Sequence, residues 1–325
     1  MKRRDFLAAL AGLALWPSFA KDERRKPVIG FLSSRTPDDS ARIVAAFRNG
    51  LAEAGYLDGQ DTTIAYRWAE GDYERLPALA NEIVGLDPSV IIAAGGEPSA
   101  LAAKAASAEI PTVFSVGGDP VKIGLVKSLN RPGGNMTGVS LLATELEAKR
   151  VGILHELRPA AKRLGVLVDR NFEESGMQVL EVMRAARDIE QPIELVYATN
   201  DDELTTAFAQ LKAAGAEALL VCASPFFDTR KAYLVVFEAQ RRVPAIYQFR
   251  DYAAQGGLMS YGISPPDAYR QVGLYAGQIL KGTSPSELPV VQPTAFEFVI
   301  NAKAAAAMGI DIPASLLARA DEVIQ

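Results

Sequence analysis

The stretch IIAAGGEPSALAAKAAS, residues 91–107, joins an apolar run to an alanine-rich segment with helical periodicity through a turn of small residues. An apolar run of this length is typical of a buried strand, and the helix after the turn completes a strand–turn–helix unit. Such a turn points free backbone N–H groups at whatever lies above it, and a helix N-terminus favours an anion. The stretch therefore predicts either a ligand site or an ordinary turn in an α/β sheet.

The same unit recurs along the chain. Apolar runs of strand length lie at 27–34, 62–71, 89–96, 111–120, 134–140, 163–169, 193–198, 218–225, 243–249, 256–264 and 294–301. Segments with helical periodicity lie at about 40–54, 73–84, 144–157, 201–215 and 265–282, and others begin near 99, 175 and 229. A last short helix is expected between an N-cap at Asn301 and a C-cap at Gly309. Alternating strands and helices predict parallel sheets wound with helices.

The number of units predicts two lobes. We expect an α/β fold of two doubly wound parallel-sheet lobes joined by a three-strand hinge, because the elements after residue 249 exceed what one sheet needs. The first lobe is expected over 27–140 plus 250–290, and the second over 141–249 plus 291–325. The three hinge strands are then expected near 140–143, 247–250 and 289–294.

The N-terminus predicts export. Residues 1–20, MKRRDFLAALAGLALWPSFA, have a basic start, an apolar stretch and small residues at Ser18 and Ala20, which is typical of a signal peptide cleaved near Ala20. The apolar part is too short to span a bilayer. Arg3 and Arg4, followed by Asp-Phe-Leu, also resemble the twin-arginine export motif, and the general secretory route is the alternative. We expect a periplasmic protein.

Composition excludes several classes of function. The formal net charge is −5, and the sequence has no clustered excess of lysine and arginine. Nucleic acid is therefore not an expected partner. Cys222 and His155 are the only residues of their types, and neither has a partner at ligand or catalytic-triad spacing. Disulfides, a His/Cys metal site and a cofactor are therefore not expected.

Three motifs carry a resemblance over essentially residues 27–325. They are GGDPVKIGLVKSLNRPGGNMTGVS (117–140), GGLMSYGIS (256–264) and FEFVINAKAAAAMGIDIPASLLARADEVI (296–324). With them the chain resembles the bacterial ABC-transporter substrate-binding proteins of the type I periplasmic-binding-protein fold, in the family related to tryptophan- and aromatic-amino-acid-binding proteins. The opening loop SSRTPDDS (33–40) lacks the His and Pro-Leu-Asp pattern of the aromatic binders. The resemblance implies a solute-binding protein without naming its solute.

The candidate ligand-binding residues lie at the strand ends that would face a crevice between the lobes. They are Ser33, Ser34, Gly95, Gly96, Glu97, Pro98, Ser99, Gly117, Gly118, Asp119, Asp169, Asn171, Ser224, Phe226, Phe227 and Gln248. The resemblance implies that the helix N-terminus at Ser99 receives a ligand carboxylate. Asp119 or Asp169 could bind an ammonium group, and Glu97 faces either solvent or a cationic part of the ligand. Phe226 and Phe227 suit an apolar side chain or the packing of the lobe.

Two classes of function fit these features. The first is a monomeric solute-binding protein that delivers a small molecule, such as an amino acid or similar carboxylate, to an ABC permease with its cytoplasmic ATPase. The second is an exported enzyme on the same scaffold, for example a hydrolase that uses Asp119 and Asp169 as a carboxylate pair across the cleft. The sequence contains no G-x-S-x-G, P-loop or G-x-G-x-x-G motif, which favours the binding protein.

Overall fold

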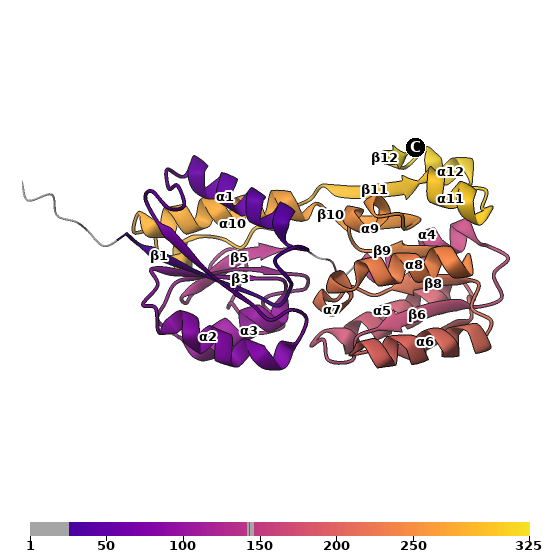
Figure 1. Ribbon diagram of the computed structural model, residues 1–325, viewed down its shortest axis with the longest axis horizontal. Coiled ribbons are helices and arrows are strands. Elements are labelled where there is room, and N and C mark those ends of the chain that lie inside the picture. Colours follow the sequence, from indigo (N-terminus) through magenta and orange to yellow (C-terminus); the bar gives the residue numbers. More distant parts are fainter. Residues whose placement is uncertain (1–25, 142, 144–145) are drawn as a thin grey trace, which may run out of the picture.

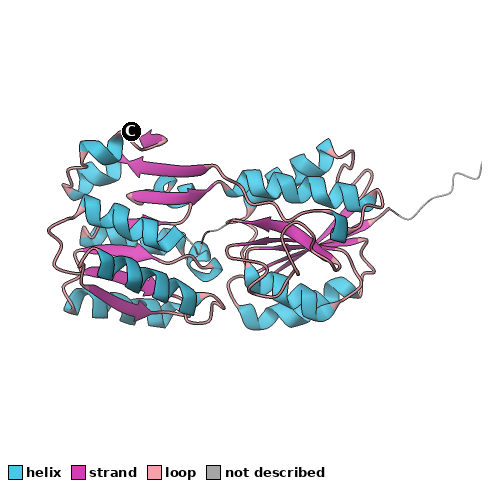
Figure 2. Ribbon diagram, turned by 180° about the vertical axis from the view of Figure 1, so that it is seen from behind, coloured by secondary structure: helices cyan, strands magenta, loops and turns pink. Residues whose placement is uncertain are grey.

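The chain folds into two α/β lobes that lie side by side, as the computed structural model shows for residues 26–141, 143 and 146–325 (Figure 1). The expected signal peptide, residues 1–20, lies outside the described residues. In each lobe a twisted sheet lies between two layers of helices (Figure 2). The expected α/β class with two lobes is confirmed.

The first sheet has the order β2-β1-β3-β4-β5, and every neighbouring pair is parallel. Its strands are β1 (Val28–Ser33), β2 (Thr63–Trp68), β3 (Val90–Ala94), β4 (Thr112–Val116) and β5 (Met136–Ser140). All residues of β3, β4 and β5 are buried, which is why these strands are near-continuous apolar runs in the sequence. The parallel arrangement places the carboxyl ends of all five strands at one edge.

The second sheet repeats this order and extends it, as β12-β11-β10-β9-β8-β6-β7. Its strands are β6 (Leu164–Val168), β7 (Ile193–Tyr197), β8 (Ala218–Val221), β9 (Ala245–Tyr247), β10 (Met259–Ile263), β11 (Phe296–Asn301) and β12 (Glu322–Ile324). The strands from β7 to β10 are parallel, whereas β11 runs antiparallel to β10. This direction is reversed because β10 leads the chain out of the lobe and β11 leads it back.

Helices cover both faces of the first sheet. Helices α1 (Ala41–Glu53) and α10 (Pro265–Leu280) pack together on one face. On the other face lie α2 (Leu76–Val84), preceded by a 3-10 turn at Tyr73–Arg75, and α3 (Glu97–Ala106). The first lobe is therefore completed by a helix that follows the second lobe's strands in the sequence (Figure 1).

The second sheet is covered in the same way. Helices α4 (Glu147–Leu157) and α5 (Ser175–Asp188) contribute to the core on one face, and α6 (Asp201–Ala213) and α8 (Lys231–Arg241) to the core on the other. The remaining helices are short: α7 (Pro225–Thr229), α9 (Arg250–Ala254), α11 (Ala302–Met308) and α12 (Ala314–Leu317). The caps expected for α11 are confirmed, because Asn301 accepts a hydrogen bond from the backbone of Ala304 and Gly309 has a φ of 70°.

The chain passes between the lobes after β5, after β10 and before β11. The expected crossing at 247–250 is wrong, because β10 pairs with both β9 and β11 in the second sheet. The second lobe therefore includes residues 250–263, and the first lobe regains the chain at α10. Val291 bridges to Val139 of β5 in the first lobe, so the last crossing falls between residues 291 and 296.

A buried ion pair lies next to the first two crossings and holds their backbones together. Arg150 and Glu147 lie 3.0 Å apart, and both side chains are fully buried. Arg150 also donates to the carbonyl oxygens of Ala143 at 3.0 Å and Tyr261 at 2.9 Å. It thus joins the first crossing to the strand that leads into the second crossing.

Candidate ligand-binding site

A cavity lies where the carboxyl ends of the two sheets meet. Its empty volume is about 430 Å³, and its lining comes from both lobes and from the first crossing. The lining residues are Arg35, Gly95, Gly96, Glu97, Ser115, Gly117, Leu141, Ala143, Phe172, Ala223, Ser224, Pro225, Asp228, Gln248, Phe249, Pro265 and Tyr269. Ligands of doubly wound sheets bind in this position, beyond the strand ends.

The turn between β3 and α3 forms part of this wall. Gly95 and Gly96 have φ values of 81° and 108°, in the region that favours glycine. A Cβ atom on Gly96 would also lie 2.9 Å from Cγ of Pro225 in the second lobe. Glycine at this position therefore lets the lobes approach closely, and α3 begins with Glu97 at the cavity.

Glu97 is the acidic side chain that the first lobe contributes to the wall. Its side chain is 1% exposed, and Oε1 accepts a hydrogen bond of 2.7 Å from the backbone N–H of Gly118. Burial raises the pKa of Glu97, and hydrogen bonds from the backbone and from Glu174 of the second lobe oppose this shift. Of the two sequence expectations for Glu97, the structure shows it turned inward.

Arg35 follows β1 and faces the second lobe. Its Nε and Nη2 atoms lie 2.6 and 2.5 Å from Oδ2 of Asp39, and Nη1 lies 3.3 Å from Oδ2 of Asp228 across the cleft. Burial lowers the pKa of Arg35, but Asp228 and Asp39 raise it further, so the guanidinium stays charged. All three nitrogen atoms of its guanidinium group therefore face carboxylates.

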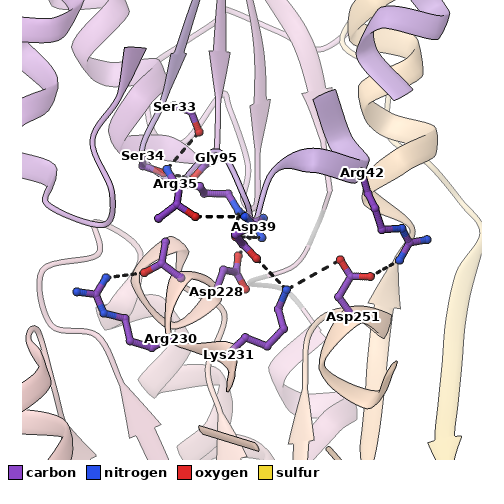
Figure 3. Close-up of polar contacts among 12 residues, drawn as sticks. Ser33, Ser34, Arg35, Asp39, Arg42, Gly95, Asp228, Arg230, Lys231 and Asp251 are labelled. Carbon is purple, nitrogen blue, oxygen red and sulfur yellow. Dashed lines mark hydrogen bonds and ion pairs between the residues drawn. The ribbon is translucent and has the colours of Figure 1, made fainter. Parts of the chain in front are cut away.

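These contacts continue across the mouth of the cleft as a charge network, which is shown in Figure 3. Lys231 lies 2.9 Å from Asp39 and 4.0 Å from Asp251, and Asp251 pairs with Arg42. The network consists in order of Asp228, Arg35, Asp39, Lys231, Asp251 and Arg42. Its charges balance, and three of its contacts join one lobe to the other.

Asp228 is also held by its own lobe. Nε2 of Gln248 donates to Oδ1 at 2.6 Å, and the hydroxyl of Tyr252 donates to the same oxygen at 3.0 Å. Burial raises the pKa of Asp228, and Arg35 lowers it in part. On the opposite wall the backbone N–H of Gly95 donates to the Tyr269 hydroxyl at 2.8 Å, which fixes the glycine turn against α10.

Tyr73 of the first lobe makes a second polar contact between the lobes. Its hydroxyl donates to Oδ2 of Asp169 at 3.1 Å and accepts a hydrogen bond of 2.9 Å from the backbone N–H of Phe226. Ser224 donates to the same Asp169 oxygen at 2.6 Å. This contact separates the cavity from a wider outer hollow with an empty volume of about 1190 Å³, which Asp169, Asn171 and Phe226 line.

The structure brings six of the expected residues to the cavity wall, and these are Gly95, Gly96, Glu97, Gly117, Ser224 and Gln248. Pro98 and Ser99 lie within the first turn of α3, and Ser33 and Ser34 lie beneath the wall, where Ser34 donates to the carbonyl oxygen of Gly95 at 2.6 Å. Gly118 faces Glu174, and Phe227 is buried in the core. The Ser99 side chain therefore does not line the cavity.

Asp119 lies on a surface turn instead. Its Oδ1 accepts a hydrogen bond of 2.9 Å from the backbone of Val121, and its other oxygen lies 3.7 Å from Nζ of Lys122. Since Asp169 is held by Tyr73 and Ser224, the two aspartates do not form a carboxylate pair at the cavity.

Several lining residues were not among the predicted candidates. Arg35 lies in the loop after β1, and Pro265 and Tyr269 lie in α10, which a crossing returns to the first lobe. Phe172, Pro225, Asp228 and Phe249 follow strand ends, so their positions were a usable signal. No local pattern could have identified Tyr269.

The described part of the chain contains no group of three or more His, Cys, Asp and Glu side chains that could hold a metal ion. None of its helices is long and apolar enough to cross a membrane.

Two α/β lobes, three crossings and a cavity between opposing strand ends define a two-lobed periplasmic-type binding protein. The family model described as ABC transporter substrate binding protein matches residues 29–324. The chain belongs to this family.

Relatives and solved structures agree with this membership. A tyrosine-binding protein of Clostridioides difficile is 27% identical over 86% of this chain and 80% of its own length. The ABC domain of Streptococcus pneumoniae in complex with L-Trp has a TM-score of 0.81 and is 28% identical, over 92% of this chain and all of that one. A conserved domain protein of Vibrio cholerae has a TM-score of 0.84 at 25% identity, with the same coverage.

Proposed function

We propose that this chain captures an amino acid, or a close analogue of one, in the cavity between its lobes and presents it to the permease of an ABC importer. The observation that carries the proposal is the cavity at the strand ends, which both lobes line, in a chain of the substrate-binding family. The names of the two relatives, which refer to tyrosine and L-Trp, support an amino acid as the ligand.

The cavity wall suits such a ligand. Leu141, Phe172 and Phe249 offer apolar surface to a side chain, and Glu97 offers a carboxylate to a protonated amine. Because both lobes line the cavity, we expect them to open for entry and to close around the ligand. We therefore place the ligand between the lobes, next to Glu97.

A thermal-shift screen of the amino acids tests this function, with native mass spectrometry of the purified protein to detect a retained ligand. A ligand that binds only the folded state raises the free energy of unfolding, by about 2.7 kcal/mol at a concentration 100 times Kd. The melting temperature rises with it. We expect at least one amino acid to do so. If no amino acid shifts the melting temperature and no ligand is retained, the proposed ligand class is wrong.

We further propose that the chain is exported to the periplasm as a monomer, with cleavage near Ala20 and the twin-arginine route as the path. N-terminal sequencing is expected to begin near Lys21, and the double substitution Arg3→Lys and Arg4→Lys is expected to block export. We assign the chain no catalytic role, and a turnover assay on glycosides is expected to show none.

A further inference from the structure

Glu97 is the charged group of the cavity wall whose charge no side chain of the described residues balances. No salt bridge joins it to a lysine, arginine or histidine of the residues that the structure describes. Its neighbours are backbone N–H groups of the glycine turns and the carboxyl group of Glu174. A buried carboxylate is costly without a partner, so a cationic ligand group would be bound strongly here.

Glu174 brings a second carboxyl group to the same place from the opposite lobe. It precedes α5 and lies so close to Gly118 that a Cβ atom there would be 1.7 Å from its Oε1. Its side chain hydrogen-bonds to Glu97, and such a contact between two carboxyl groups requires a proton on one of them. Closure thus brings one carboxyl group from each lobe together at the edge of the cavity.

Arg35 offers little to a ligand carboxylate, although it lines the same cavity. Its Nε, Nη1 and Nη2 atoms all face Asp39 or Asp228 (Figure 3). The cavity wall therefore presents a balanced charge network on one side and the Glu97 carboxyl group on the other.

We propose that the ligand is recognised by its protonated amine, which binds between Glu97 and Glu174, and that a ligand carboxylate is dispensable. This inference rests on the proposed function, and it defines the ligand class more narrowly as primary amines with an apolar body. Because one carboxyl group comes from each lobe, the same ammonium group joins the lobes.

Two matched sets of compounds test the inference by isothermal titration calorimetry. They are L-tyrosine, tyramine and 3-(4-hydroxyphenyl)propionate, and L-tryptophan, tryptamine and indole-3-propionate. We expect the amine of at least one set to bind within about tenfold of its amino acid. The acid without an amine is expected to bind about 10- to 150-fold more weakly, as the loss of a charged hydrogen bond predicts.

The outcomes separate the two proposals. If the acids bind as tightly as the amino acids, or if the amines fail where the amino acids bind, the amine inference is wrong and the solute-binding function stands. If none of the six compounds binds and the wider amino-acid screen is also negative, the proposed function fails together with the inference.

Variants locate the contact. Glu97→Gln and Glu174→Gln each replace a carboxyl group by an amide of the same shape that cannot become a carboxylate, and each is expected to weaken the tightest amine ligand at least tenfold. Glu173→Gln makes the same replacement at the exposed neighbouring residue and is the matched control, for which unchanged affinity is expected. Thermal melting verifies that each variant is folded. Parental affinity in both test variants would overturn the assignment.

Discussion

Glu238 shows how a single buried carboxyl group can link the stability of the second lobe to pH. It lies in α8, is 1% exposed, and accepts hydrogen bonds from the backbone of Ala245 at 2.8 Å and of Leu258 at 3.1 Å. The Tyr247 hydroxyl donates to its other oxygen at 2.9 Å. Burial raises the pKa of Glu238 from 4.5 to about 8.

The folded chain therefore binds one more proton than the unfolded chain between these two pKa values. The stability that this group contributes is fully present below pH 4.5 and is lost as pH rises through about 8. The loss amounts to at most about 1.4 kcal/mol per pH unit. Glu238→Gln is expected to flatten the decline, because its amide can donate to Tyr247 and has no proton to lose. Urea unfolding of both proteins from pH 5 to 8 measures this, and parallel curves would contradict it.

Single residues also show where the sequence sufficed for the site. Gly95, Gly96 and Glu97 could be predicted because a turn between an apolar run and a helix is a local pattern. The carboxyl groups of Asp119 and Glu97 could not be told apart, because direction depends on backbone geometry. Tyr269 could not be found at all, since it reaches Gly95 over 174 residues of chain.

At the scale of elements, the close contact between α1 and α10 depends on glycines. A Cβ atom on Gly273 would lie 2.1 Å from the carbonyl oxygen of Phe47, and one on Gly50 would lie 1.9 Å from that of Arg270. Backbone atoms on both sides leave no flexible group that could move aside. The helices can approach this closely because neither position carries a side chain.

Gly273→Ala is therefore expected to destabilise the protein by about 2 kcal/mol or more, through overpacking of the two helices. Gly152, in α4, is the matched control, because a Cβ atom there meets nothing within 4 Å. Gly152→Ala is expected to stabilise by about 0.5 to 1 kcal/mol through helix propensity. Midpoints of urea unfolding measure both changes, and a neutral Gly273→Ala would show that the helices can separate at no cost.

Elements were predictable from the sequence to the extent that burial alone defines them. The apolar runs predicted β1 to β11, and the signal was clearest for strands such as β3 and β4, which are buried throughout. The same runs do not state which sheet a strand joins, so β10 was placed in the wrong lobe. The short strand β12 was missed because its residues are only partly buried and carry no apolar run.

For the whole molecule, the charge network favours the closed arrangement. Its contacts from Arg35 to Asp228, from Asp39 to Lys231 and from Arg42 to Asp251 each join the lobes and would separate on opening. Arg35 and Lys231 lower the pKa of Asp39 by more than burial raises it, so this carboxylate stays charged.

Lys231→Met is therefore expected to increase the radius of gyration of the ligand-free protein, measured by small-angle X-ray scattering. Because binding requires closure, ligand affinity is expected to fall about tenfold for each 1.4 kcal/mol of lost closed-state stability. Lys303→Met, at an exposed position of α11, is the control. An unchanged scattering curve for Lys231→Met, with unchanged affinity, would show that the network does not hold the lobes together.

The return of α10 to the first lobe sets an order for synthesis. The ribosome completes β1 to β5 before residue 141, yet the part of the sheet face that α10 covers beside α1 stays exposed until residue 280 has been made. In a nascent chain of 140 residues one face of the first sheet is therefore incompletely covered. The contact between α1 and α10 that completes it spans more than 200 residues of sequence. Such distant contacts form late in folding, and exposed apolar surface invites aggregation meanwhile. Neither lobe can therefore complete its layers until nearly the whole chain has left the ribosome, because the first lobe needs α10 and the second needs β11.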